Sequence, residues 1–141
     1  MAVRTLLLVD DDLDEHILLR LAIEETKKAI IITDAYSGPE AVEQLKNSTN
    51  LPELILLDIN MPFVNGFETL EMLKRDEALG QIPVVMYSTT SDSRTHKKAE
   101  TAGAAGFITK PPDFVSLCHF TRSFFDEFTP AGFKEYNGNL S

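Results

Sequence analysis

Polar residues that can do chemistry stand directly after four apolar runs of this 141-residue chain. In chain order they are Asp10-Asp11, Asp58, Ser88-Thr89 and Lys110. Three carboxylates brought together would repel one another and raise one another's pKa, unless a hard cation took oxygen ligands from them. We therefore predict a magnesium site, because Mg²⁺ binds carboxylates while keeping several of its waters.

A carboxylate in such a pocket can attack a phosphoryl group and become an aspartyl phosphate, because the metal and a lysine offset charge on the phosphoryl oxygens. Asp58 is the best placed acceptor, since it ends an apolar run and the loop 59–66 that follows is rich in turn residues. Lys110 and the Ser88 hydroxyl are predicted to contact the phosphoryl group. A lone aspartate after a strand is usually a turn residue or a helix cap, so the prediction depends on the joint pattern.

The apolar runs themselves predict the elements that position these residues. They cover 5–9, 30–33, 53–57, 82–87 and 105–108, with segments of helical length between them. The first and third runs are continuous, which is typical of strands covered by helices on both faces of a parallel sheet. Repeated strand–helix alternation predicts right-handed crossovers and an open, doubly wound α/β sheet of five strands. Ligands of such sheets bind beyond the carboxyl ends of the strands, where the polar residues stand.

Five helices are predicted between and after the runs. Asp12 with Glu15, and Ser37 with Glu40, have capping-box spacing at the start of the first two. The others are expected at about 67–76, at 92–102, and from 112 or 113 to 128. The fourth has a weak apolar face and a basic run, 94–98, that is expected to be solvated.

The last helix is expected to bury one apolar face in the core. The residues on that face are Phe114, Leu117, Cys118, Phe125 and Phe128. Phe120 lies off that face and, with Phe133 and Tyr136, is a candidate interaction surface. The three histidines, His16, His96 and His119, lack metal-ligand spacing and are expected at the surface.

Composition bounds the remaining possibilities. With 43% hydrophobic and 25% charged residues, the chain is expected to form one globular domain over 1–128, followed by a loose tail over 129–141 with no output domain. A net charge of -9 disfavours binding to nucleic acid or an anionic membrane. The N-terminus lacks signal-peptide features, no run has membrane-spanning length, and Cys118 is the one cysteine, so we expect a cytoplasmic protein.

The motifs resemble those of response-regulator receiver domains of two-component signalling, from about residue 5 to 128. Those motifs are Leu8-Val9-Asp10-Asp11-Asp12, Leu56-Leu57-Asp58-Ile59-Asn60-Met61-Pro62 with Gly66, Pro83-Val84-Val85-Met86-Tyr87-Ser88, and Gly106-Phe107-Ile108-Thr109-Lys110-Pro111. The resemblance implies a flavodoxin-like sheet of strand order 2-1-3-4-5, the order found in the chemotaxis member of this family. Features of the 82–89 stretch, the last helix and the tail resemble single-domain regulators that work with phytochrome-type kinases.

The resemblance also implies roles for individual residues. Asp11, Asp58 and the Asn60 carbonyl would bind Mg²⁺ directly and Asp10 would act through water. Phe107 would be the switch aromatic that turns inward on phosphorylation, and Ser88 the switch hydroxyl. Pro111 would follow a cis peptide bond. Thr89 stands where alanine or glycine is usual, so its bulk bears on reaction rates.

Three functions remain as hypotheses. The first is a single-domain response regulator, a phosphoacceptor and not an enzyme beyond its own phosphotransfer and autodephosphorylation. It would take phosphate from a histidine kinase or phosphotransfer protein, and signal to a protein target through a changed surface or a homodimer formed by helix 4, strand 5 and helix 5. The second is a constitutive interaction module that is seldom phosphorylated. The third is a magnesium-dependent phosphatase, which usually has a second aspartate where this chain has Asn60.

Overall fold

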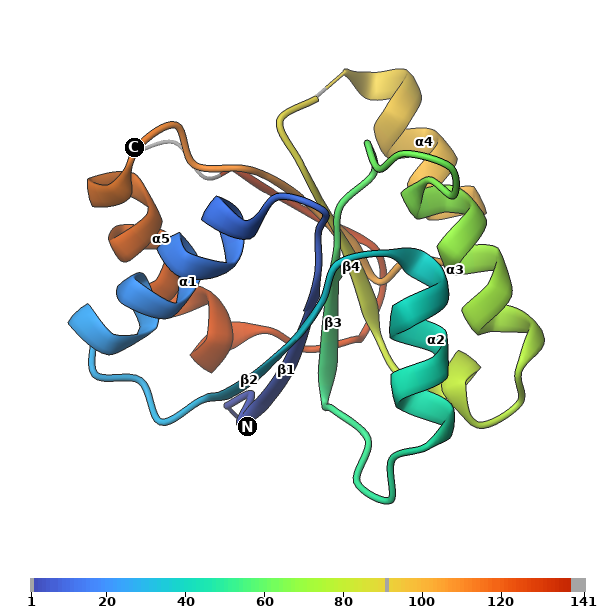
Figure 1. Ribbon diagram of the computed structural model, residues 1–141. Coiled ribbons are helices and arrows are strands. Elements are labelled where there is room, and N and C mark those ends of the chain that lie inside the picture. The colour runs from blue at the N-terminus through green and yellow to red at the C-terminus, as the bar shows by residue number, and fades with distance from the viewer. Residues whose placement is uncertain (1, 91, 138–141) are drawn as a thin grey trace.

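Six parallel strands form the central layer of the structure, a computed structural model that describes residues 2–90 and 92–137 (Figure 1). In the order of the chain, the strands are β1 (Thr5–Val9), β2 (Ile31–Ala35), β3 (Leu54–Leu57), β4 (Val84–Ser88), β5 (Gly106–Thr109) and β6 (Lys134–Asn137). Their order in the sheet is β2-β1-β3-β4-β5-β6. The doubly wound α/β class predicted from the alternating pattern is therefore confirmed.

Five α-helices in the described part of the chain cover the two faces of the sheet. They are α1 (Leu13–Glu25), α2 (Gly38–Lys46), α3 (Gly66–Arg75), α4 (Ser93–Thr101) and α5 (Phe114–Glu127), with a short 3₁₀ helix, η1 (Leu79–Gln81), before β4. Figure 1 shows α1 and α5 together on one side of the sheet and α2, α3 and α4 on the other. None of the described helices has both the length and the apolar character needed to cross a membrane.

Both faces of the central strands are buried, which explains their continuous apolar runs. In β1, Leu6 and Leu8 pack in the core beneath α1 and α5, while Leu7 and Val9 pack in the core beneath α2 and α3. Successive side chains of a strand point to opposite faces, so a strand covered on both sides must be apolar at every position. Apolar burial on both faces fixes the depth of β1 and β3, and with it the position of the polar residues at their ends.

The sheet has six strands, so the prediction of five is wrong. Residues 134–137, which lie in the segment expected to be a loose tail, pair in parallel with β5, with Gly106 opposite Lys134. A Cβ on Gly106 would lie only 2.7 Å from the Lys134 carbonyl oxygen, so the absence of a side chain allows this approach. The Tyr136 ring packs edge-on against Phe124 at a centroid distance of 4.9 Å. Long-range packing therefore forms a strand from a sequence rich in polar residues.

Side-chain caps define the residues at which three of the helices begin. Asp12 caps α1 by accepting from the backbone N–H of Asp14, and Ser37 caps α2 by accepting from that of Glu40. The start of α3 has a full capping box, formed by Asn65 and Glu68, that the sequence interpretation missed.

The last helix begins after its cap residue Asp113, and most of its predicted apolar face is buried. Phe114, in the first turn of α5, is an exception with 38% exposure. Phe120, a candidate for an interaction surface, instead stacks on Phe124 at 4.8 Å. Intramolecular contacts thus account for much of the aromatic excess at this end of the chain.

Candidate functional site

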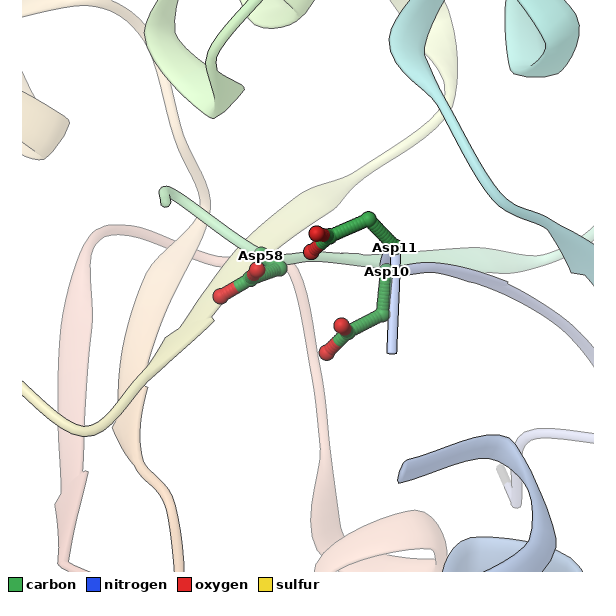
Figure 2. Close-up of side chains that lie close together, drawn as sticks. All are labelled: Asp10, Asp11 and Asp58. Carbon is green, nitrogen blue, oxygen red and sulfur yellow. The ribbon is translucent and has the colours of Figure 1, made fainter. Parts of the chain in front are cut away.

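Three aspartates meet where β1 and β3 end (Figure 2). Asp10 and Asp58 are buried, with 1% and 6% exposure, whereas Asp11 is exposed. One carboxylate oxygen from each of the three lies within 4.8 Å of the others. Figure 2 shows the carboxylates of Asp10 and Asp11 turned from the end of β1 toward Asp58. The arrangement agrees with the prediction from the sequence that these side chains share one rim.

Lys110, just after β5, provides positive charge in this pocket. Its Nζ lies 2.9 Å from Asp10 Oδ2, 3.5 Å from Asp58 Oδ1 and 3.7 Å from Glu15 Oε2. The same ammonium lies 5.3 Å from the centre of the buried Tyr87 ring. The Lys110 backbone N–H donates to the Ser88 carbonyl at 2.8 Å, which ties the lysine to the end of β4.

The Asp58 carboxylate has a clearly raised pKa. Burial raises its pKa to about 6, Lys110 opposes that rise, and the negative charges of Asp10 and Asp11 add to it. One lysine therefore does not compensate the charge that the pocket holds when all its carboxylates are ionised. A hard divalent cation bound by carboxylate oxygens would compensate it, so these residues fit Mg²⁺ in both donor type and charge.

Backbone geometry after β3 aims Asp58 at the pocket. The Asp58 N–H donates to the Val9 carbonyl at 2.9 Å, and the loop closes through a 2.8 Å bond from the Gly66 N–H to the Ile59 carbonyl. A Cβ on Gly66 would lie 2.3 Å from the Asp58 carbonyl oxygen. Only glycine allows the start of α3 to approach the acceptor aspartate this closely.

Asp10 is held through both its backbone and its side chain. Its N–H donates to the Ala35 carbonyl at 3.1 Å, and its Oδ1 accepts from the Asp12 N–H at 3.0 Å. Its carbonyl oxygen lies 2.8 Å from Nε2 of His16, which is only 1% exposed. The expectation that His16 lies at the surface is wrong. Its spacing from Leu19 and Ile23, three and seven residues on, places it on the buried face of α1 and could have indicated this.

The other predicted site residues lie around this centre. Ser88 is fully buried and its Oγ accepts from the Thr90 N–H at 3.2 Å, whereas Thr89 is exposed. Asn60 is also exposed, in the loop that follows Asp58. The described residues contain no cis peptide bond, so the prediction of a cis bond before Pro111 is wrong. The trans isomer is the intrinsically preferred one for a bond before proline.

Phe107 of β5 is completely buried and contacts a second histidine. Its ring centroid lies 4.2 Å from that of His96 on α4. His96 in turn pairs with Glu135 of β6. His96, which was expected at the surface, is only partly exposed, with 16% of its side chain accessible, while His119 is exposed as expected. These contacts connect α4, β5 and β6.

Comparison with known proteins identifies the class to which this fold and site belong. Residues 6–122 match the response regulator receiver domain family, so the chain belongs to that family. Membership confirms the class predicted from the motifs, a receiver domain of two-component phosphorelay signalling, on a flavodoxin-like fold.

This chain covers different shares of the length of its individual relatives. Chemotaxis protein CheY of Halobacterium salinarum is 38% identical over 108 residues, which are 77% of this chain and 85% of CheY. Response regulator PleD of Caulobacter vibrioides is 33% identical over 117 residues, 83% of this chain but only 25% of PleD. The chain therefore spans about a quarter of the length of PleD. Among solved structures, the phosphorylated cyanobacterial phytochrome response regulator RcpA has a TM-score of 0.76 and 27% identity, with 86% of this chain and 90% of RcpA covered.

Proposed function

We propose that this receiver domain accepts a phosphoryl group on Asp58 from a histidine kinase or a phosphotransfer protein, in a reaction that depends on Mg²⁺. One observation carries the proposal. The buried Asp58 carboxylate lies 3.5 Å from Lys110 Nζ and close to the oxygens of Asp10 and Asp11, on the rim where the strands end. Such a site combines a nucleophile, a cation and the ligands for a second cation.

Each residue has a distinct part in the proposed reaction. An Asp58 oxygen attacks phosphorus, the phosphorus–nitrogen bond to the donor imidazole breaks, and its electron pair leaves with the imidazole. Asp11 and Asp58, the Asn60 carbonyl, and Asp10 through water would hold the metal, which when bound would supply positive charge to the phosphoryl oxygens. Lys110, 3.5 Å from Asp58, would contact the phosphoryl oxygens through its ammonium group.

The approach to the pocket supports a protein as the phosphodonor. Leu13 and Ile17 of α1 are exposed although apolar, and Phe63 in the loop after Asp58 is fully exposed. A donor protein that brings an imidazole to Asp58 must cover this rim, where these side chains offer apolar contact. We propose a phytochrome-type kinase as the donor, a class suggested by the phytochrome response regulator RcpA among the similar structures.

Signalling is proposed to pass from the phosphoryl group to the surface made by α4, β5 and α5, with Ser88 donating its hydroxyl to that group. Thr89, exposed beside it, limits access and sets the rate. The contacts from Phe107 to His96 and on to Glu135 offer a route by which a change at β5 reaches α4 and β6. β6 lies along the edge of β5, so a protein target or second copy approaching this surface meets β6. The remaining predictions of a cytoplasmic location and of no output domain stay predictions.

A labelling experiment tests the proposal. A small phosphodonor, such as acetyl phosphate, is expected to label the wild-type protein in the presence of Mg²⁺, and Asp58→Asn is expected to take up no label. Asp11→Asn keeps the nucleophile and is expected to need much more Mg²⁺ for the same labelling rate. Labelling that persists in Asp58→Asn would contradict the proposal. A phosphotransfer profile against kinases of the source organism then identifies the donor.

The position of Phe107 favours one second candidate, a constitutive interaction module with a single conformation. Phe107 is already 0% exposed and packed in the core, which is where the switch aromatic is expected to turn. The two candidates differ in the response to Mg²⁺ and a phosphoryl mimic such as beryllofluoride. A switching receiver shows changed Phe107 and His96 resonances, whereas a constitutive module shows none.

A further inference from the structure

His16 makes two hydrogen bonds from a buried position beside the aspartate pocket. Its Nε2 lies 2.8 Å from the Asp10 carbonyl oxygen, and its Nδ1 lies 2.7 Å from Asp34 Oδ1 on β2. A carbonyl oxygen can only accept, so Nε2 is the donor to Asp10, while Nδ1 is the ring atom that faces the Asp34 carboxylate. Arg20 pairs with the other oxygen of Asp34 and completes the chain of contacts.

The Asp10 carbonyl belongs to the peptide bond that joins Asp10 to Asp11. Holding this oxygen fixes the plane of that peptide, and with it the direction in which the Asp11 side chain leaves the backbone. Asp11 is exposed and is not itself held by the core. The contact from His16 therefore orients the exposed aspartate as well as the buried one.

We propose that His16 is a positioning residue for the aspartate pocket, which sets its affinity for Mg²⁺ by holding the Asp10–Asp11 peptide against β2. The inference rests on the proposed function and deepens it, because it names a residue outside the pocket that controls the same site. Groups that orient metal ligands typically change metal affinity 10- to 100-fold when they are removed. His16 acts on the metal only through Asp10 and is not itself a ligand.

Two substitutions at this position separate the hydrogen bond from the bulk of the ring. His16→Leu fills the space of the ring with an apolar side chain but leaves the Asp10 carbonyl without its donor. We therefore expect Mg²⁺ affinity to fall about 10-fold. His16→Gln can still donate to Asp10, but its amide oxygen then faces the Asp34 carboxylate. Adding Asp34→Asn supplies an amide N–H to that oxygen. The double variant thus rebuilds both hydrogen bonds, and we expect it to recover most of the affinity.

A matched control distinguishes positioning from stability. Leu19→Ala removes a side chain that is 2% exposed on the same helix and packs in the apolar core beneath α1 and α5. It destabilises the fold without touching the Asp10 carbonyl, so its Mg²⁺ affinity is expected to remain that of the wild type. Calorimetric titration with Mg²⁺ measures all variants under conditions in which each is folded.

Hydrogen exchange provides a readout that needs neither metal nor phosphorylation. The Asp12 amide donates to Asp10 Oδ1 at 3.0 Å and therefore reports how firmly Asp10 is held. In metal-free protein we expect this amide to exchange several-fold faster in His16→Leu, and at the wild-type rate, corrected for overall stability, in Leu19→Ala and in the double variant.

The outcomes decide the two proposals separately. Mg²⁺ affinity that stays within twofold of the wild type in His16→Leu, or that falls as far in Leu19→Ala, overturns the role of His16. A double variant that binds Mg²⁺ no better than His16→Leu also overturns it. If His16→Leu does not fold, a double variant that binds Mg²⁺ about 10-fold more weakly than the wild type overturns the role instead. A wild type that binds Mg²⁺ but takes no label on Asp58 contradicts the proposed function alone, because the titration and the amide exchange need no phosphorylation.

Discussion

Lys110 Nζ lies 2.9 Å from Asp10 Oδ2, and both groups are largely removed from water, with side-chain exposures of 11% and 1%. Burial lowers the pKa of the lysine, but the attraction of Asp10 and Asp58 outweighs it and leaves the Lys110 pKa raised. The ammonium is thus bound to the carboxylates before any phosphoryl group arrives. After phosphorylation, the Lys110 ammonium must interact with both Asp10 and the new phosphoryl oxygens.

Removing the cation should destabilise the metal-free protein. In Lys110→Met the Asp10 carboxylate is left buried without its partner, and breaking a buried pair from one side costs about 3–5 kcal/mol. We expect urea unfolding to show a loss of about 3 kcal/mol, part of which Mg²⁺ restores. Lys97→Met, at an exposed position of α4, is the control and should stay within about 0.5 kcal/mol of the wild type. Equal effects of the two substitutions would contradict the interpretation.

The raised pKa of Asp58 predicts a pH dependence of stability. Because the pKa is about 6 in the folded protein against a usual value of 3.8, the folded state holds this proton more tightly than the unfolded one. Stability from the neutral carboxyl group is present at low pH and is lost as pH rises from about 4 to about 6. The Asp58→Asn variant does not lose this stability. Without Mg²⁺ at pH 8, its free energy of unfolding should therefore be about 2 kcal/mol higher than that of the wild type.

Denaturant titrations at several pH values measure that difference. The advantage of Asp58→Asn over the wild type should shrink toward pH 4, where the wild-type carboxyl is protonated in the folded state. Asp14→Asn, at an exposed position of α1, is the control and should show no such trend. An advantage that grows as the pH falls would show that the Asp58 pKa is not raised.

Phe63 adopts a left-handed backbone conformation, with φ at 66°, although it carries a large side chain. The left-handed region costs an ordinary residue roughly 1–2 kcal/mol. Phe63 is fully exposed, so no burial of its ring offsets this cost. We expect Phe63→Gly to raise the free energy of unfolding by about 1 kcal/mol, which is unusual for a change to glycine. Phe63→Ala removes the ring but keeps the Cβ, and should gain little. Thermal unfolding compares them, and an alanine variant as stable as the glycine variant would exclude relief of backbone strain.

Gly106 is expected to control whether β6 joins the sheet. A Cβ there would approach the Lys134 carbonyl to 2.7 Å and the Tyr136 ring to 3.2 Å. Gly106→Ala should therefore release β6, exposing residues 134–137 to protease and to amide exchange while β1 and β3 stay protected. Gly80→Ala, whose added Cβ would meet its nearest atom at 3.4 Å, is the milder control. Protection of β6 that survives Gly106→Ala would show that the close approach is not needed.

The sequence predicted those features that short-range patterns specify. Continuous apolar runs located β1 and β3, and the polar residues after them were correctly expected to meet, because strand ends of a parallel sheet share one edge. β6 could not be found in this way, since its strand structure depends on pairing with β5 and on packing against Phe124. The contact of His16 with Asp34 likewise joins residues 18 positions apart, on different elements. A histidine read alone gives no indication of such a partner, although the helical spacing of its apolar neighbours does indicate burial.

The buried Tyr87 ring beside Lys110 provides an intrinsic optical probe of the pocket. The chain has no tryptophan and three tyrosines, so tyrosine dominates its near-ultraviolet emission. Tyr36 packs against His16 with tilted rings whose centroids lie 4.4 Å apart, and Tyr136 lies on β6, so each ring samples a different region. Replacing two of the three by phenylalanine would leave a single emitter, with which events at the pocket, at the His16 contact or at the sixth strand can be followed in unlabelled protein.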